Sequence, residues 1–130
     1  MFQMRVNFLQ HPPKANYANM SIDQIYTYMF WEAELTILYD DYVIFSEVVA
    51  IVEYYWYLVN WYRKYLAGEK RPFTYCTVEH SVPILEFLPL GNDCWKIDSI
   101  WNKCNKSFWV KETALCSEVR KFIINSNMEN

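Results

Sequence analysis

Cys76 and His80 are the residues whose types and spacing first suggest chemistry, and Glu79 lies next to the histidine. A cysteine thiolate beside an imidazole can act as a nucleophile, and both residue types are common zinc ligands. On a strand, positions four apart are separated by about 13 Å, so the pair meets only if the chain turns between them. Zinc sites usually contain closely spaced ligand pairs, which this sequence lacks. We therefore expect a buried Cys76 and a loop histidine rather than a catalytic or metal site.

Glu32 and Glu34 are a second candidate, because on a strand they would share one face about 7 Å apart, a separation compatible with paired-carboxylate hydrolysis. Every E-x-E strand produces this spacing, so solvated glutamates are the simpler interpretation. The two glycines, Gly68 and Gly91, are too few for a phosphate-binding loop such as G-x-G-x-x-G. The motifs G-x-S-x-G and H-E-x-x-H are also missing. The sequence therefore predicts a protein that is not an enzyme and has no cofactor or metal.

Acidic residues are concentrated in one part of the chain. Between Ala15 and Tyr62 there are seven acidic residues and no lysine or arginine, whereas the remainder has twelve basic and eight acidic residues. The seven are Asp23, Glu32, Glu34, Asp40, Asp41, Glu47 and Glu53. Such a region would repel nucleic acid and anionic lipid and would attract a cationic protein. The alternative is that these acids simply form the solvated faces of strands and a helix.

Neither the opening of the chain nor its most apolar segment predicts export or membrane insertion. The opening MFQMRVNFLQ lacks the basic start and the apolar block of a signal peptide. The segment from Tyr42 to Tyr62 contains Glu47 and Glu53, and a central carboxylate costs about 2.5 to 3.5 kcal/mol on membrane insertion. We therefore expect a cytoplasmic protein with reduced thiols. Its cysteines are Cys76, Cys94, Cys104 and Cys116.

The first part of the chain predicts three strands. Apolar and polar residues alternate over residues 2–8 and again, for longer, from Thr27 to Tyr39. The apolar residues that share one face of the second strand are Met29, Trp31, Ala33, Leu35, Ile37 and Tyr39. Asp40-Asp41 is typical of a turn, and Tyr42 to Phe45 would form a short third strand.

A helix is predicted from Glu47 to Ala67, with Ser46 as its N-cap and Gly68 as its C-terminal cap. Its apolar face would contain Val48, Ile51, Val52, Tyr55, Leu58, Val59, Tyr62 and Leu66. The stretch EYYWYLVNWYRKY places further aromatic residues beside that face, and we call Tyr54, Trp61 and Tyr65 the aromatic shoulder. The shoulder is either a seam with another helix or an uncovered patch of about 300 to 600 Å² that could bind a partner.

The second half of the chain predicts three more strands and a last helix. The strands are Phe73 to Val78, Pro83 to Leu90 and Cys94 to Trp101, and the helix runs from Lys111 to Asn125. Gly91-Asn92-Asp93 would join two of the strands as a hairpin. The sequence therefore predicts one α+β domain over residues 1–130, with an antiparallel sheet of about five to six strands, two helices on one face and the order β-β-β-α-β-β-β-α.

Three stretches, PFTYCTVEHSVPILEF, WKIDSIW and VKETALCSEVRKFI, resemble segments of a group of small uncharacterised bacterial proteins. These proteins accompany polymorphic toxins of the contact-dependent inhibition type as immunity partners. The resemblance covers about the last 85 residues, from the predicted long helix onward. It implies a cytosolic inhibitor that occludes the active site of a toxin or docks beside it, and it implies no particular binding residues.

The sequence thus favours an immunity protein that binds and neutralises a cognate, cationic protein toxin, such as a nuclease. The residues expected to contact the toxin are Asp40, Asp41, Glu47, Glu53, Tyr54, Tyr57 and Trp61, with Glu32 and Glu34 as a second candidate surface. The alternative is a structural protein that self-associates, for example as a homodimer, through the aromatic shoulder.

Overall fold

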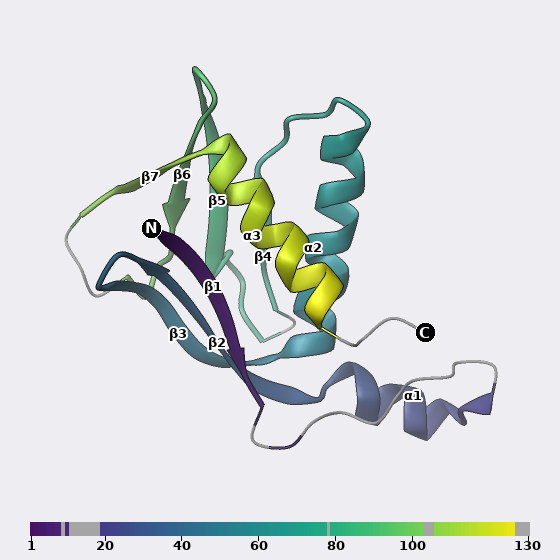
Figure 1. The fold of residues 1–130 in the computed structure, drawn as a ribbon. Coiled ribbons are helices and arrows are strands. Elements are labelled where there is room, and N and C mark those ends of the chain that lie inside the picture. The colour runs from purple at the N-terminus through teal and green to yellow at the C-terminus, as the bar shows by residue number, and fades with distance from the viewer. Residues whose placement is uncertain (9, 11–18, 78, 103–105, 127–130) are drawn as a thin grey trace.

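The computed structural model describes residues 1–8, 10, 19–77, 79–102 and 106–126, and these residues form an α+β fold with two antiparallel sheets (Figure 1). The first sheet has the order β1-β2-β3 and consists of β1 (Phe2–Asn7), β2 (Glu32–Tyr39) and β3 (Tyr42–Ala50). The second has the order β4-β5-β6-β7 and consists of β4 (Phe73–Tyr75), β5 (Leu85–Gly91), β6 (Cys94–Asp98) and β7 (Phe108–Lys111).

Three helices accompany the sheets: α1 (Ile22–Met29), α2 (Ile51–Leu66) and α3 (Glu112–Asn125). Figure 1 shows α2 and α3 next to each other, with β1 running past α3. The α+β class and the antiparallel pairing are confirmed. The prediction of a single sheet with two helices is wrong, because the strands divide into two sheets around α2 and because α1 and β7 were not predicted.

The predicted strand from Thr27 to Tyr39 is correct only in its second part. Its first residues belong to α1, and β2 begins at Glu32. Ser21 and Gln24 form a capping box at the start of α1, in which each side chain bonds the backbone amide of the other. This local motif satisfies two amides that an isolated helix start leaves unpaired, so it favours the helix over the alternating pattern.

The boundary between β3 and α2 lies later than the sequence predicted. Ser46 is not a helix cap but a strand residue, and its hydroxyl lies 3.2 Å from that of Thr36 across the ladder. The cap residue is Ala50, which makes no side-chain cap bond. Val48 and Val49 are β-branched and pair with β2, and this long-range pairing extends the strand where local periodicity predicted a helix.

The aromatic shoulder is inside the molecule. Tyr54 is 0 % and Trp61 is 6 % exposed, whereas Tyr65 is half-buried. The Trp61 ring lies 5.5 Å from that of Trp95 in the second sheet, and the Tyr54 ring lies 5.4 Å from that of Phe122 in α3. Of the two alternatives for the shoulder, the uncovered patch is therefore wrong for Tyr54 and Trp61, and the seam with another helix is correct in part. α2 packs against both sheets as well as α3, so its buried arc is wider than one apolar face.

The β5–β6 hairpin is confirmed, and Gly91, Asn92 and Asp93 have φ values of 84°, 54° and 57° in its turn. Adjacent residues with positive φ match the right-handed twist of the two strands. The predicted last helix is also confirmed, and it begins at Glu112. One core cluster includes residues from both sheets and all three helices. The Phe45 ring of β3 lies 6.1 Å from the Trp101 ring, which follows β6. This contact joins the parts of the core that the two sheets contribute.

Among the residues that the structure describes, none of the three helices has both the length and the apolar composition that crossing a bilayer requires.

Candidate functional site

An open cavity of about 460 Å³ lies where the end of β3, the end of α1, the first turn of α2 and the β4–β5 connection meet. Four of its lining residues are acidic: Glu32, Glu47, Glu53 and Glu79. Tyr26, Phe30, His80 and Trp101 supply the aromatic part of the lining. Of the residues that the structure describes, no lysine or arginine lines it. We call it the acidic cavity.

Each carboxylate of the acidic cavity comes from a different element. Glu32 is the first residue of β2, Glu47 lies near the end of β3, and Glu53 is in the first turn of α2. Glu47 is opposite the fully buried Leu35, so it lies on the inner face of the first sheet. Glu79 comes from the β4–β5 connection. Folding therefore places around one cavity acidic residues that are far apart in the sequence, and the two most distant, Glu32 and Glu79, are separated by 47 positions.

The described residues supply no ion pair that would neutralise the negative charge of the acidic cavity. None of the ion pairs among the described residues involves one of its four carboxylates. Glu53 instead accepts a hydrogen bond of 3.2 Å from the Tyr75 hydroxyl. Burial, with a further contribution from the Glu53 carboxylate, raises the pKa of Tyr75 above its ordinary value of 10.0, so this hydroxyl stays protonated and donates. The cavity therefore has a negative potential available to a cationic ligand.

The rim of the acidic cavity is partly aromatic and exposed. Tyr26 is 67 % and Phe30 is 38 % exposed, and their rings lie 4.7 Å apart on one face of α1. The His80 and Trp101 rings lie 5.0 Å apart. Aromatic faces attract lysine and arginine cations, and carboxylates pair with them. The lining can therefore hold a cationic side chain through both kinds of contact.

The Cys76 and His80 side chains do not form a nucleophilic pair. The chain turns between them, and the His80 amide bonds the Thr77 carbonyl at 3.1 Å. The Cys76 thiol, however, donates to the backbone carbonyl of His80 at 3.1 Å, while the His80 ring nitrogen Nδ1 contacts the Thr77 hydroxyl. Within the described part of the chain, no three histidine, cysteine, aspartate or glutamate residues are grouped so that they could hold a metal ion.

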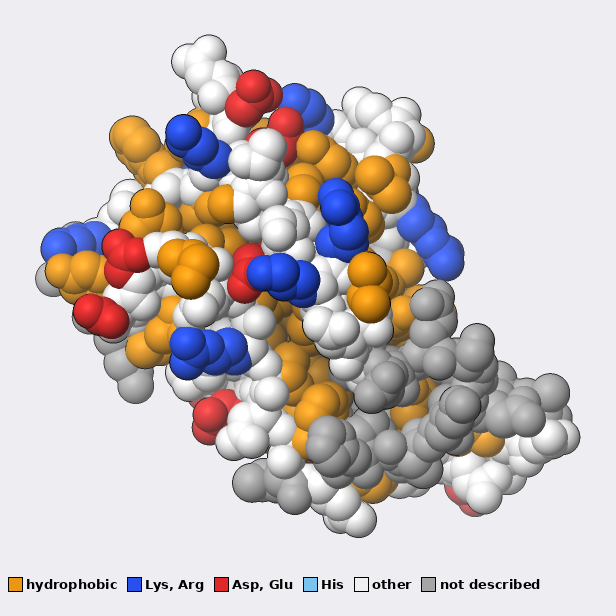
Figure 2. Space-filling view, viewed as in Figure 1, with side chains coloured by type: hydrophobic (Ala, Val, Ile, Leu, Met, Phe, Trp, Pro, Cys, Tyr) orange, Lys and Arg blue, Asp and Glu red, His pale blue; other side chains and the backbone are white. Residues whose placement is uncertain are grey.

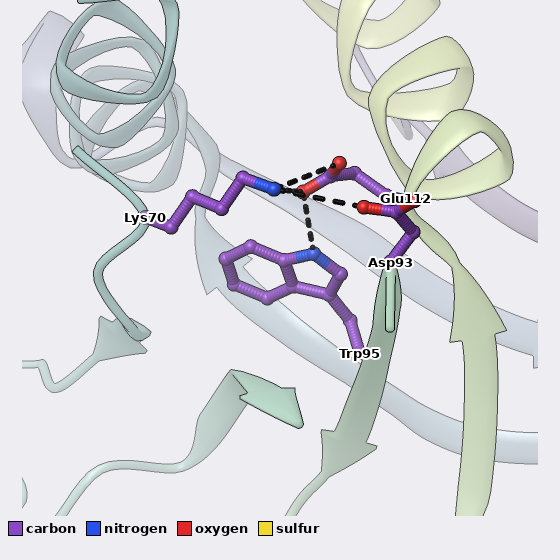
Figure 3. Close-up of polar contacts among 4 residues, drawn as sticks. All are labelled: Lys70, Asp93, Trp95 and Glu112. Atoms are coloured by element: carbon purple, nitrogen blue, oxygen red, sulfur yellow. Dashed lines mark hydrogen bonds and ion pairs between the residues drawn. The ribbon is translucent and has the colours of Figure 1, made fainter. Parts of the chain in front are cut away.

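A second polar cluster surrounds Glu112 at the start of α3 (Figure 3). The Glu112 carboxylate accepts a hydrogen bond of 3.1 Å from the Trp95 indole and forms an ion pair of 3.3 Å with the Lys70 amino group. The same amino group lies 3.7 Å from the Asp93 carboxylate. These contacts tie the turn after α2 and the β5–β6 hairpin to α3. Burial raises the pKa of the neighbouring Cys116 thiol, so this cysteine is not activated as a nucleophile. The Glu112 cluster is structural.

The residues predicted to contact a partner fall into four groups. Glu32, Glu47 and Glu53 line the acidic cavity, and Tyr57, 41 % exposed, follows Glu53 by one helical turn. Asp40 and Asp41 form the β2–β3 turn, six residues or more from Glu47 along β3 and so about 20 Å away by strand rise.

Asp40 has a local role, because its carboxylate contacts the Met1 amino group. Glu34 is exposed on the outer face of the first sheet, opposite Val48. Tyr54 and Trp61 are buried, so they are not available to touch a partner directly. Only the glutamates Glu32, Glu47 and Glu53 are thus brought together.

Sequence reasoning missed the remaining walls of the acidic cavity. Tyr26 and Phe30 lie on or just after α1, and the capping box at Ser21 was the signal that could have located them. Glu79, His80 and Trp101 lie outside helices and strands, where no sequence periodicity indicates which way a side chain points.

Basic residues are gathered on other elements. Exposed lysines and arginines occur in the last two turns of α2, in the connection after it and along α3, and Figure 2 shows such side chains scattered over the face on which α3 lies. They are Arg63, Lys64, Lys70, Arg71, Arg120 and Lys121. The acidic cavity therefore lies at the opposite end of α2 from the basic residues of that helix.

The fold and the cavity define a small α+β protein with an acidic, aromatic-rimmed recess. A family model for a domain of unknown function, DUF7878, matches residues 4–129, and the chain belongs to this family. A search of curated proteins and a search of solved structures each found no match.

Proposed function

We propose that this protein is a binding protein without catalytic activity, and specifically an immunity protein that neutralises a cationic toxin domain such as a nuclease. The observation that carries the proposal is the acidic cavity, which four carboxylates without ion-pair partners among the described residues line beside exposed aromatic rings. The resemblance of the second half of the chain to immunity proteins supports the biological role.

The acidic cavity supports recognition of a lysine or arginine on the partner. A nuclease must present a cationic surface to bind phosphates, and an acidic inhibitor can cover that surface while excluding the nucleic acid. Unpaired carboxylates also accelerate the encounter of oppositely charged proteins. Self-association through the aromatic shoulder is not proposed, because Tyr54 and Trp61 are already packed inside the domain.

The test measures binding to the protein encoded by the neighbouring gene, with Glu47→Lys and Glu53→Lys combined in one variant. We expect the affinity to fall by about 10- to 100-fold, mainly through slower association, and growth protection against the toxin to be lost. Glu34→Lys with Asp41→Lys is the matched control, because it reverses the same number of charges outside the acidic cavity. Its effect should stay within about threefold.

The Glu53 change also removes the acceptor of the Tyr75 hydrogen bond, so a loss of binding in the first variant could reflect misfolding. A second variant separates the two causes. Glu32→Lys with Glu79→Lys changes two exposed residues of the same cavity and should weaken binding in the same direction. Equal affinities for all three variants and the unmodified protein would contradict the proposal.

A further inference from the structure

The outer edge of β3 has backbone groups that pair with no strand in the described part of the chain. β3 pairs with β2 on one side, and the second sheet forms its own ladder. Among the described residues, no backbone hydrogen bond outside the ladder reaches residues 42–50. Such an edge is a template for an additional strand.

The phase of the ladder identifies which groups point outward. The Ile51 amide donates to the Trp31 carbonyl at 2.9 Å, so this pair belongs to the hydrogen-bonded set. In an antiparallel ladder, hydrogen-bonded pairs recur at every second residue. The backbone N–H and C=O groups of Val49 and Glu47 therefore point toward β2. The amides of Ser46, Val48 and Ala50 therefore point away from β2.

The opposite edge of the same sheet is closed. The Met4 amide on the outer side of β1 donates to the Glu118 side chain of α3 at 3.2 Å, and α3 runs along β1. The start of β3 has neighbours too, since the Lys106 amino group bonds the Tyr42 hydroxyl and the Trp101 ring lies 6.1 Å from that of Phe45. The two edges nevertheless differ, because no such contact among the described residues reaches the outward amides in the second half of β3.

The acidic cavity lies against the open edge. Four consecutive residues of β3, from Glu47 to Ala50, line it, so the cavity adjoins the edge and not merely one face of the strand. We propose that an extended, cationic segment of the partner pairs with β3 as a fourth strand and places a lysine or arginine among Glu47, Glu53 and Glu79. This deepens the proposed function and rests on it.

Charge favours a cationic segment over a second copy of this chain at the edge. Antiparallel pairing of two β3 strands about Val48 would place the two Glu47 side chains diagonally on one face, about 7 to 8 Å apart, with both acidic cavities next to each other. Like charges at that distance repel. A lysine-bearing strand instead supplies both the backbone partners and the missing positive charge.

The test is an NMR titration of the full chain with a short synthetic peptide in which lysine and threonine alternate. We expect saturable shifts and slowed hydrogen exchange at the Ser46 and Val48 amides, and no such change with a peptide in which glutamate replaces lysine. Val48→Pro removes an outward amide without removing a β2–β3 bond, so the fold should persist while the peptide affinity falls by about tenfold or more. Val48→Thr keeps the amide and should change the affinity by less than about twofold.

Peptide binding that is unchanged in Val48→Pro, or shifts that spare the Ser46 and Val48 amides, would overturn the proposal. Slowed exchange of these amides in the free protein, together with a doubled mass, would also overturn it by assigning the edge to a second copy. The amide measurement on the unmodified chain decides the matter even if Val48→Pro does not fold.

The two proposals fail differently. If the Glu47→Lys and Glu53→Lys variant loses the cationic partner while Val48→Pro retains it, the strand pairing is wrong and the proposed function stands. If neither change matters to the partner, the proposed function itself fails.

Discussion

Glu112 shows how a single carboxylate can stabilise three segments at once. Burial alone would raise the pKa of Glu112, but the bonds from Trp95 and Lys70 outweigh it and hold the pKa below the ordinary value of 4.5. A carboxylate with a lowered folded-state pKa stabilises the fold above its unfolded-state pKa, and this contribution is lost as the pH falls through the folded-state value. The same pairing raises the pKa of Lys70, whose hydrogen bond to Glu112 is the main cause.

We predict that Glu112→Gln lowers the free energy of unfolding by about 1 kcal/mol near neutral pH, because a charge-assisted bond is replaced by a neutral one. The difference from the unmodified protein should shrink as the pH falls below 4.5, the ordinary value for this group. Urea denaturation at several pH values measures it. Glu69→Gln, in an exposed pair with Arg71, is the control and should have little effect at any pH. A difference independent of pH would disprove the assignment.

At the residue scale, the sequence predicted part of the acidic cavity. The absence of lysine and arginine around Glu32, Glu47 and Glu53 indicated an acidic region, and the structure places these three side chains around one cavity. Asp40 belongs to the same acidic run but lies at the far end of β3. Charge composition indicates which region is acidic, whereas the direction of each strand decides which acids meet.

At the scale of the elements, α2 shows where sequence periodicity stops being informative. The periodic face identified Ile51, Val52, Tyr55 and Leu58 as buried, and each of them is 0 % exposed. Val48 and Leu66, at the ends of the same predicted face, are 54 % and 66 % exposed. Periodicity does not reveal how many partners a helix has, so Tyr54 and Trp61 were placed outside a core that surrounds them. The end of β3 depends similarly on pairing with β2, which no local window contains.

The buried position of Trp61 predicts a large difference between two tryptophan substitutions. Trp61→Ala should lower the free energy of unfolding by about 3 to 5 kcal/mol, because it leaves a cavity among the Phe73, Phe87 and Trp95 rings. Trp109, 61 % exposed on β7, is the matched control, and its change to alanine should stay within about 0.5 kcal/mol. Denaturant titration compares the two, and similar losses would contradict the packing of α2.

At the scale of the whole molecule, both sheets contribute to one core through α2. We predict a single unfolding transition, with far-ultraviolet circular dichroism and tryptophan fluorescence giving the same midpoint, because neither sheet can lose its share of the core independently. Two separated midpoints would show that the sheets unfold as separate units. The fold class was predictable from alternating patterns and turns, whereas the division into two sheets depends on which strands meet in space.

The exposed connection between α2 and β4 has one more consequence. Every strand ladder lies entirely before it or entirely after it, since the first sheet ends at Ala50 and the second begins at Phe73. Severing the chain there would give two fragments, each with all of its ladder partners, that reassociate through side-chain packing and through side-chain hydrogen bonds such as those from Tyr75 to Glu53 and from the Met4 amide to Glu118. Recovery of the native fold would then become bimolecular and would depend on fragment concentration.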